Sequence, residues 1–428
     1  MRSRHAWLVA GMLVACSSDE NASSSNPNPD AGADAELDAG GIEWCPAGGV
    51  SKGPWVMHVD GTSALLRWEA CRPGTSAELS WGKEGGALDQ KATATAKDVV
   101  IPVTYLAALA PKQPQDLEGT YTMHEVALSG LEAGQCYAYV LGQDAEKKGR
   151  FCTARPSGQS FKILATGDTN PGLNDYTVKL IQVMAKEDYD LTLHAGDIQY
   201  YASGLESWQA WFGFMAPMLA QGAFLPAVGN HEYEQPQEFE LYYQRFWDLA
   251  GFDVKQPGVF RAESGGLHFF FLNTEKDYGA GSVQFTWFEA ALADASKKPG
   301  YRGSIVVIHK PMLTCGDMSQ NDGARAALQP AFEQYGVKFV LQGHMHGYER
   351  FEVPTTADPT KTTTYLTVGG GGGLIGKVDA NIDRPTCAMR KSSGAFYQMT
   401  MLEVGPTSIK GRTLDVDGKE RDAFEKPL

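Results

Sequence analysis

The 428-residue chain lacks several patterns that would point to common classes of protein. It has no excess of positive charge: its formal net charge is −14, and nucleic acid or an anionic membrane would repel so acidic a chain. It has no CxxC pair, which argues against a zinc site built from thiolates. It also has no apolar run long enough to cross a bilayer as a helix, because the stretch at 6–15 is about half the required length.

The N-terminus does carry the pattern of an export signal. Arg2 and Arg4 precede the apolar stretch, which ends in LVAC at Cys16. This ending resembles a bacterial lipobox, in which the signal is removed and the cysteine is lipidated; an ordinary signal peptide is the alternative. We therefore expect residues 1–16 to be a lipoprotein signal peptide. The mature protein would sit at the cell envelope, at the outer membrane on the evidence of Ser17, facing the periplasm or the surface, with the lipid as its only membrane attachment.

Residues 17–42 are polar, acidic and almost free of large apolar side chains, so they cannot bury enough surface to fold. We expect a disordered acidic linker. Six cysteines remain after Cys16, and an even number in an exported chain predicts disulfides. Proximity along the chain favours the pairs Cys45–Cys71, Cys136–Cys152 and Cys315–Cys387.

The rest of the chain is typical of two domains. Residues 43–156 hold short runs of aromatic and β-branched residues between Gly, Pro and Asp turns, which predicts an all-β domain without a catalytic constellation. Leu131, Gly134 and Tyr137 resemble the tyrosine corner of fibronectin-type-III-like sandwiches, where the hydroxyl caps backbone just upstream. Residues 157–428 alternate strands with helices before a final run of strands, which predicts an α/β domain with a largely parallel core.

Polar residues follow five expected strands of the second domain, at the point where each strand ends. Sites in open α/β sheets lie at the carboxyl ends of the strands, and a glycine just before a functional residue permits a close approach. We expect these side chains to converge with a sixth, His346, although they span about 180 residues. The five strand-end residues are Asp168, Asp197, Asn230, His309 and His344.

The chemistry of this set indicates a metal centre. Two carboxylates, a carboxamide and three imidazoles suit manganese, iron, zinc or cobalt. They exceed what one tetrahedral zinc needs, so a carboxylate shared by two metal ions is favoured. A mononuclear zinc enzyme acting on amides would leave Asn230 and one carboxylate unexplained. Each motif alone is more commonly a turn; the ordered series carries the prediction.

The series GD, GDxxY, GNHE, VxxH and GHxH resembles that of the calcineurin-like metallophosphoesterases, and more narrowly the purple acid phosphatases. The resemblance covers nearly all of residues 45–428. It implies a fibronectin-III-like β-sandwich followed by a four-layer α/β metallophosphoesterase domain, with mixed sheets flanked by helices. It also implies a dinuclear metal centre that hydrolyses phosphoric esters.

The resemblance further implies a role for each site residue. Asp168, Tyr200 and His346 would hold iron(III), and Asp197 would bridge. Asn230, His309 and His344 would hold the second ion, which would be zinc, manganese or iron(II). The seven ligands so implied are Asp168, Asp197, Tyr200, Asn230, His309, His344 and His346.

Asn230 and His231 would contact the substrate. His231 would donate a proton to the leaving alkoxide, with Glu232 orienting its ring. The chain departs from plant-type members because no histidine lies between His309 and His344. The phosphate would then be bound by Lys310, by Arg325 or by a residue of another loop. The glycine-rich stretch 369–376 is expected to be a close-approach loop at the rim.

The predicted function is an exported phosphatase of the acid phosphatase type, in which a metal-held hydroxide attacks phosphate monoesters. One alternative is a metallophosphodiesterase acting on nucleotides or lipid headgroups. Another is an inactive cell-surface binding protein. The expected partner is the phosphate ester, with no nucleic acid as a structural partner, and the oligomeric state is left open.

Overall fold

The structure, a computed structural model, describes residues 45, 48–101, 119–142, 144–200, 208–233, 239–247 and 256–428. The predicted signal peptide, Cys16 and the predicted linker lie outside these ranges, and so does Tyr201. Within them, no helix combines the length and the apolar character needed to span a membrane.

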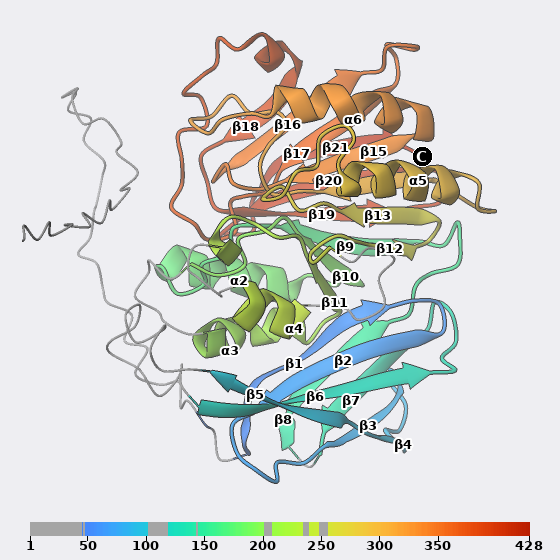
Figure 1. Cartoon of the computed structure of the whole chain (residues 1–428), viewed down its shortest axis with the longest axis vertical. Helices are drawn as coiled ribbons and strands as arrows, with labels where there is room; N and C mark the ends of the chain where they lie inside the picture. The colour runs from blue at the N-terminus through green and yellow to red at the C-terminus, as the bar shows by residue number, and fades with distance from the viewer. Residues whose placement is uncertain are drawn as a thin grey trace, which may run out of the picture. The chain divides into compact units, whose positions relative to one another are not determined.

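Three parallel strands form the centre of the first sheet (Figure 1). They are β9 (Phe161–Thr166), β10 (Leu191–His194) and β11 (Ala223–Pro226), with β10 in the middle. An antiparallel run continues the sheet beyond β9. It consists of β19 (Gln398–Val404), β20 (Ser408–Asp415) and β21 (Glu420–Pro427).

The second sheet has seven strands in the order β12-β13-β14-β15-β17-β16-β18. Its four central strands run parallel, and the remaining three are antiparallel to their neighbours. The strands are β12 (Phe260–Ser264), β13 (Leu267–Phe271), β14 (Gly303–Val307), β15 (Val337–Gln342), β16 (Tyr348–Pro354), β17 (Thr362–Thr367) and β18 (Arg390–Gly394).

The two sheets face each other, and helices cover their outer faces. One apolar core lies between the sheets and joins Ile163 and Leu193 to Ile305 and Phe339. A second core packs helices against the first sheet, and a third packs helices against the second sheet. This helix–sheet–sheet–helix order is the α/β architecture with mixed sheets that the sequence predicts. The helices are α2 (Asp175–Lys186) and α3 (Trp208–Leu219) on one side, and α5 (Val283–Ser296) and α6 (Asp322–Tyr335) on the other.

Local sequence explains where these helices begin and end. Asn174 forms a capping box with Thr177 at the start of α2, which satisfies backbone N–H groups that the first turn leaves without partners. The buried side chains of α2 recur at helical spacing along one face. Gly336 ends α6 with a φ of 70°, a left-handed conformation that glycine adopts at no steric cost.

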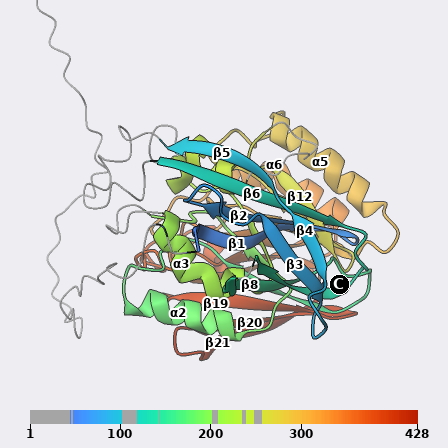
Figure 2. The ribbon, with the colours of Figure 1, turned by 90° about the horizontal axis from the view of Figure 1, so that it is seen from below.

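The described residues between 48 and 152 contain only strands, as the sequence predicts, and these strands form two groups of four. Four of them extend the first sheet, and Figure 2 shows these lying side by side. They are β1 (Val50–Val59), β2 (Ser63–Ala70), β5 (Thr95–Ile101) and β6 (Gly119–Ser129). The others form a separate sheet: β3 (Glu78–Lys83), β4 (Gln90–Thr93), β7 (Cys136–Leu141) and β8 (Asp144–Cys152).

Buried contacts join the N-terminal strands to the α/β part. Strand β1 pairs in parallel with β11 at Val56 and Ala223, and the ring of Trp55 lies 4.8 Å from that of Phe212 in α3. Glu69 of β2 is fully buried; its carboxylate lies 2.7 Å from Lys52 Nζ and 2.5 Å from an Arg245 guanidinium nitrogen. Arg245 begins the short helix α4 (Arg245–Trp247). The domain boundary near residue 156 stays a prediction. Two of the apolar cores contain residues from both sides of it.

The three disulfides are those predicted from proximity: Cys45–Cys71, Cys136–Cys152 and Cys315–Cys387. The tyrosine-corner geometry is also present, because the N–H of Glu132 donates to the Tyr137 hydroxyl at 2.9 Å. Both features tie loops to strands at points that the sequence singles out.

Candidate metal centre

The polar residues after the strands meet where the carboxyl ends of the two sheets face each other. Asp168 follows β9, Asp197 follows β10, and His344 follows β15. These are the three non-glycine residues with positive φ among the described residues, at 59°, 51° and 66°. Left-handed backbone costs a non-glycine residue energy, and such strain is typical of functional sites. The strain therefore supports the site that strand order predicts.

A first cluster consists of Asp168, Asp197, Tyr200 and His346. The Tyr200 hydroxyl oxygen lies 3.0 Å from Asp168 Oδ1, 3.1 Å from Asp197 Oδ2 and 3.0 Å from His346 Nε2. His346 Nε2 is 3.3 Å from Asp168 Oδ1. The carboxylates and the imidazole are close enough together to hold one metal ion, and Tyr200 lies among them.

A second cluster consists of Asp197, Asn230, His309 and His344. His309 Nε2 lies 3.2 Å from Asp197 Oδ2, 3.0 Å from Asn230 Oδ1 and 3.2 Å from His344 Nδ1. Asp197 therefore belongs to both clusters, as a bridging ligand would. The seven side chains that the sequence singles out are all brought together, in the two groups that it predicts.

Backbone carbonyls set the orientation of two imidazoles. His309 Nδ1 lies 2.8 Å from the carbonyl oxygen of Ala195, and His346 Nδ1 lies 2.7 Å from that of Leu374. A carbonyl can only accept, so each Nδ1 carries the hydrogen, and Nε2 of the neutral ring keeps a lone pair aimed at its cluster. Several lone-pair atoms of nitrogen and oxygen then converge at each point. Such a donor set fits a cation of the manganese, iron or zinc type.

The electrostatics of the clusters follow from burial and close charges. Burial opposes charge on His309, but the carboxylates of Asp197 and Asp168 outweigh it and raise the pKa of His309 to about 10. Burial, together with the same carboxylates, also raises the pKa of Tyr200. A tyrosinate at this position would need a strongly acidic cation beside it.

His231 lies on the accessible side of the clusters. Its backbone N–H donates to Asp197 Oδ1 at 2.9 Å, and its ring centroid is 4.2 Å from that of Tyr200. Its Nε2 is 3.9 Å from Asp197 Oδ2, and 23% of the side chain is exposed, whereas Asp197 is buried. An imidazole so placed can meet a ligand that approaches from solvent.

Glu232 has a role that the sequence does not suggest. Its buried carboxylate accepts from the backbone N–H groups of Asp197, Ile198 and Gly229, at 3.1, 2.8 and 2.6 Å. Glu232 thus fixes the backbone of two loops. The sequence had instead suggested that Glu232 orients the ring of His231. Burial and the charge of Asp197 raise the pKa of Glu232 to about 7. A carboxylate two residues after Asn230 was visible in the sequence, but its partners were not.

Glycines let the loops approach the clustered side chains closely. A Cβ at Gly229 would lie 2.1 Å from Asp197 Oδ1, and one at Gly343 would lie 2.6 Å from Asp168 Oδ2. In the glycine-rich stretch, a Cβ at Gly373 would lie 2.5 Å from the His346 ring. That stretch is therefore a close-approach loop, as the sequence predicts.

His194 and the two basic residues suggested for the phosphate have other partners. His194 is buried, and its Nε2 lies 3.0 Å from Thr169 Oγ1. Lys310 pairs with Glu275 at 2.7 Å, and Arg325 pairs with Asp322 at 3.1 Å.

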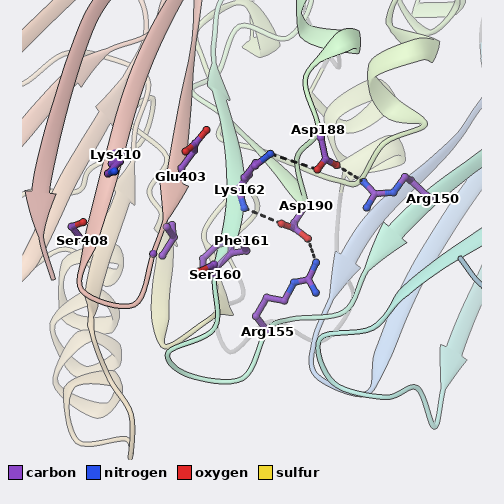
Figure 3. A pocket seen from close by; sticks show the side chains of 12 residues that line it. Arg150, Arg155, Ser160, Phe161, Lys162, Asp188, Asp190, Glu403, Ser408 and Lys410 are labelled. Atoms are coloured by element: carbon purple, nitrogen blue, oxygen red, sulfur yellow. Dashed lines mark hydrogen bonds and ion pairs between the residues drawn. The ribbon is translucent and has the colours of Figure 1, made fainter.

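A cavity of about 420 Å³ lies away from the clusters, at the N-terminal ends of β9 and β10 (Figure 3). Arg155 contacts Asp190 across it, and Arg150 and Lys162 both approach Asp188. The charges of Arg150, Arg155 and Lys162 at this cavity are therefore paired.

Comparison with known proteins agrees with this geometry. Residues 161–348 match the calcineurin-like phosphoesterase family. Purple acid phosphatase 22 of Arabidopsis thaliana is 25% identical over 264 residues, which cover 59% of each chain. Purple acid phosphatase 23 of the same plant is 26% identical over 76% of this chain and 78% of its own. For purple acid phosphatases 22 and 21 of this plant, the match spans 59% of the length of each relative, which is less than two thirds.

A solved structure shows the same fold. The purple acid phosphatase PPD1 from yellow lupin (Lupinus luteus) seeds superimposes with a TM-score of 0.68 over 87% of this chain and 74% of its own, at 17% identity. Residues 161–348 are therefore a calcineurin-like phosphoesterase domain, and the chain has homologues named purple acid phosphatase.

Proposed function

We propose that this protein is an exported phosphatase with a dinuclear metal centre that hydrolyses phosphate monoesters. The observation that carries the proposal is the pair of donor clusters that share Asp197, with Tyr200 in one of them. Relatives named purple acid phosphatase support the reaction class. The wider fold alone would not select it, because one fold hosts many functions.

Each cluster would hold one ion. Asp168, Tyr200 and His346 would bind the first, Asn230, His309 and His344 the second, and Asp197 both. Two bound ions supply the activation of a water and the neutralisation of charge on the phosphate. The residues of the chain would fix the positions of both ions, because Ala195, Leu374 and Glu232 hold the proposed ligands and their loops in place.

His231 and Asn230 would handle the substrate. His231 is partly exposed beside Tyr200 and Asp197, so its imidazole can hydrogen-bond to the phosphate or donate a proton to the departing alkoxide oxygen. Asn230 precedes it in the same turn and places its amide oxygen next to His309.

Tyr200 favours iron(III) in the first cluster, with zinc, manganese or iron(II) in the second. A free phenol has a pKa of about 10, and here burial and two carboxylates raise the pKa of Tyr200 further. Ionisation of this phenol therefore requires a cation of high charge in direct contact.

The test combines metal analysis with two substrates. Purified protein is measured for metal content and visible absorption, then assayed with an aryl phosphate monoester and the matching diester. We expect two metals per chain, one of them iron, and faster hydrolysis of the monoester. Preference for the diester would select the phosphodiesterase alternative. Two metals without hydrolysis of either ester would select the binding protein.

The N-terminal half carries two further proposals. The strands between 48 and 152 would form a fibronectin-III-like sandwich that supports the catalytic part, since four of them form a separate sheet, four extend the first sheet, and Tyr137 forms the corner contact. Cys16 would be lipidated. Incorporation of labelled fatty acid into the protein, and its loss in Cys16→Ala, tests the anchor.

A further inference from the structure

The ring of His346 is oriented by a segment far along the chain. Its Nδ1 donates to the carbonyl oxygen of Leu374 at 2.7 Å, and the N–H of Gly376 donates back to the His346 carbonyl at 2.8 Å. Residues 374–376 therefore hold both the side chain and the backbone of this residue. They begin a segment, residues 374–389, that we call the rim strap.

The rim strap buries one apolar side chain, Val378, and packs Cys387 and Met389 partly against the third core. Leu374 and Ile382, by contrast, are 70% and 49% exposed. The short helix η5 (Pro385–Met389), at the end of the strap, contains no buried residue. A segment of 16 residues with a single fully buried apolar side chain depends on other interactions to stay closed.

Polar contacts and a disulfide fasten the strap to the loop after His309. The N–H of Asn381 donates to the Cys315 carbonyl at 2.8 Å. The Arg384 guanidinium donates to the carbonyl oxygens of Thr314 at 2.9 Å and Met318 at 3.1 Å. The Cys315–Cys387 disulfide adds a covalent link between two points 72 residues apart.

The loop that receives the strap is fixed in the core. Glu349 of β16 accepts from the Thr314 hydroxyl at 2.6 Å and from the Cys315 N–H at 2.8 Å. Gly316 packs so tightly on Met345 that a Cβ there would lie 2.2 Å from the sulfur. Met345 separates His344 from His346, so the receiving loop lies directly beneath the two histidines.

We propose that the Cys315–Cys387 disulfide positions His346 through the rim strap and thereby sets the affinity of the first cluster for its metal. The inference rests on the metal centre of the proposed function. The disulfide acts at a distance, through Arg384, Asn381 and the Leu374 carbonyl. Groups that orient a ligating histidine typically change metal affinity by about 10- to 100-fold.

A double substitution with a matched control tests the positioning role. Cys315→Ser combined with Cys387→Ser removes this disulfide. Cys136→Ser combined with Cys152→Ser removes the disulfide that links β7 to β8, where the Arg155 guanidinium donates to the Cys136 sulfur. Metal content is measured after dialysis against graded chelator. We expect the first variant to lose one of two metals at about 10- to 100-fold lower chelator, and the control to match the wild type.

A second variant covers the case in which the double substitution fails to fold. Arg384→Ala keeps the disulfide and removes two contacts of the strap; we expect earlier loss of the same single metal. In metal-free protein, limited proteolysis should cut within 377–386 faster in both variants than in the control. Equal metal retention and equal cleavage in all proteins would overturn the positioning role.

The proposed function fails by a different result. A wild-type protein that binds two metals and hydrolyses no ester would refute it and leave the metal-retention comparison valid.

Discussion

His309 donates its Nδ1–H to the carbonyl oxygen of Ala195, 2.8 Å away, although the two residues follow strands of different sheets. Ala195 precedes Gly196 and Asp197, so the loop that presents the shared carboxylate also orients an imidazole of the second cluster. The contact makes the candidate metal centre dependent on the packing of the two sheets. Substitutions that move either loop should therefore alter both clusters.

Asp197→Asn tests the shared carboxylate. The amide cannot bridge two cations as a carboxylate does, and its NH₂ group would face lone pairs of His309 and Tyr200. We expect loss of at least one metal and a fall in kcat/KM of more than about 100-fold, since a ligand matters more than the groups that orient it. Asp190→Asn, at the distant cavity, is the control and should keep both metals.

Tyr200→Phe tests the choice of metal. The change removes the only atom through which the side chain reaches the cluster, so a visible band that depends on tyrosinate should disappear. Absorption spectra of the purified proteins check this. Tyr201→Phe, which changes a residue outside the described ranges, should leave the band intact. A band that persists in Tyr200→Phe would refute iron(III)–tyrosinate ligation and keep only the broader phosphoesterase assignment.

His231→Asn tests proton donation. If the imidazole protonates the leaving group, its removal should lower kcat by about 10²- to 10⁴-fold for alkyl phosphates. Aryl phosphates with acidic phenols leave without a proton and should lose far less. Metal content should not change, because His231 lies outside both donor sets. An equal loss for both substrate types would assign His231 to phosphate binding.

Glu69→Gln tests the link between the N-terminal strands and α4. Burial would raise the pKa of Glu69, but the charges of Arg245 and Lys52 outweigh it and hold that pKa below its usual value. The stabilisation is thus complete above the unfolded-state pKa of about 4.3 and is lost as pH falls through the lower folded value. Breaking a buried pair costs about 3–5 kcal/mol, so denaturant unfolding at pH 7 should show a loss of this size.

The difference between wild type and Glu69→Gln should shrink below about pH 4, where protonation makes the native side chain resemble the variant. Glu289→Gln changes an exposed residue of α5 and serves as the control. A difference between wild type and Glu69→Gln that stays constant with pH would exclude the ion pair as its cause.

The convergence of the candidate ligands was predictable because each lies shortly after a strand with a strong local signal. Strand β1 was not predicted, since the Gly53–Pro54 step inside it resembles a turn, yet β1 joins the two halves of the ten-stranded sheet. The sequence also could not predict the partners of Glu232 or the path of the rim strap. Both depend on contacts between segments distant in the chain, which no local periodicity encodes.

Gly229→Ala tests the close approach at the shared carboxylate. A Cβ there would lie 2.1 Å from Asp197 Oδ1, a separation that must displace the carboxylate or the loop. We expect the variant to fold, because the strain is confined to one loop, but to bind metal more weakly by at least about tenfold. Gly61→Ala is the matched control, since its Cβ would meet its nearest neighbour at 3.8 Å, an ordinary contact. Isothermal titration of the metal-free proteins with zinc measures the difference, and equal affinities would show that the Asp197 carboxylate tolerates displacement.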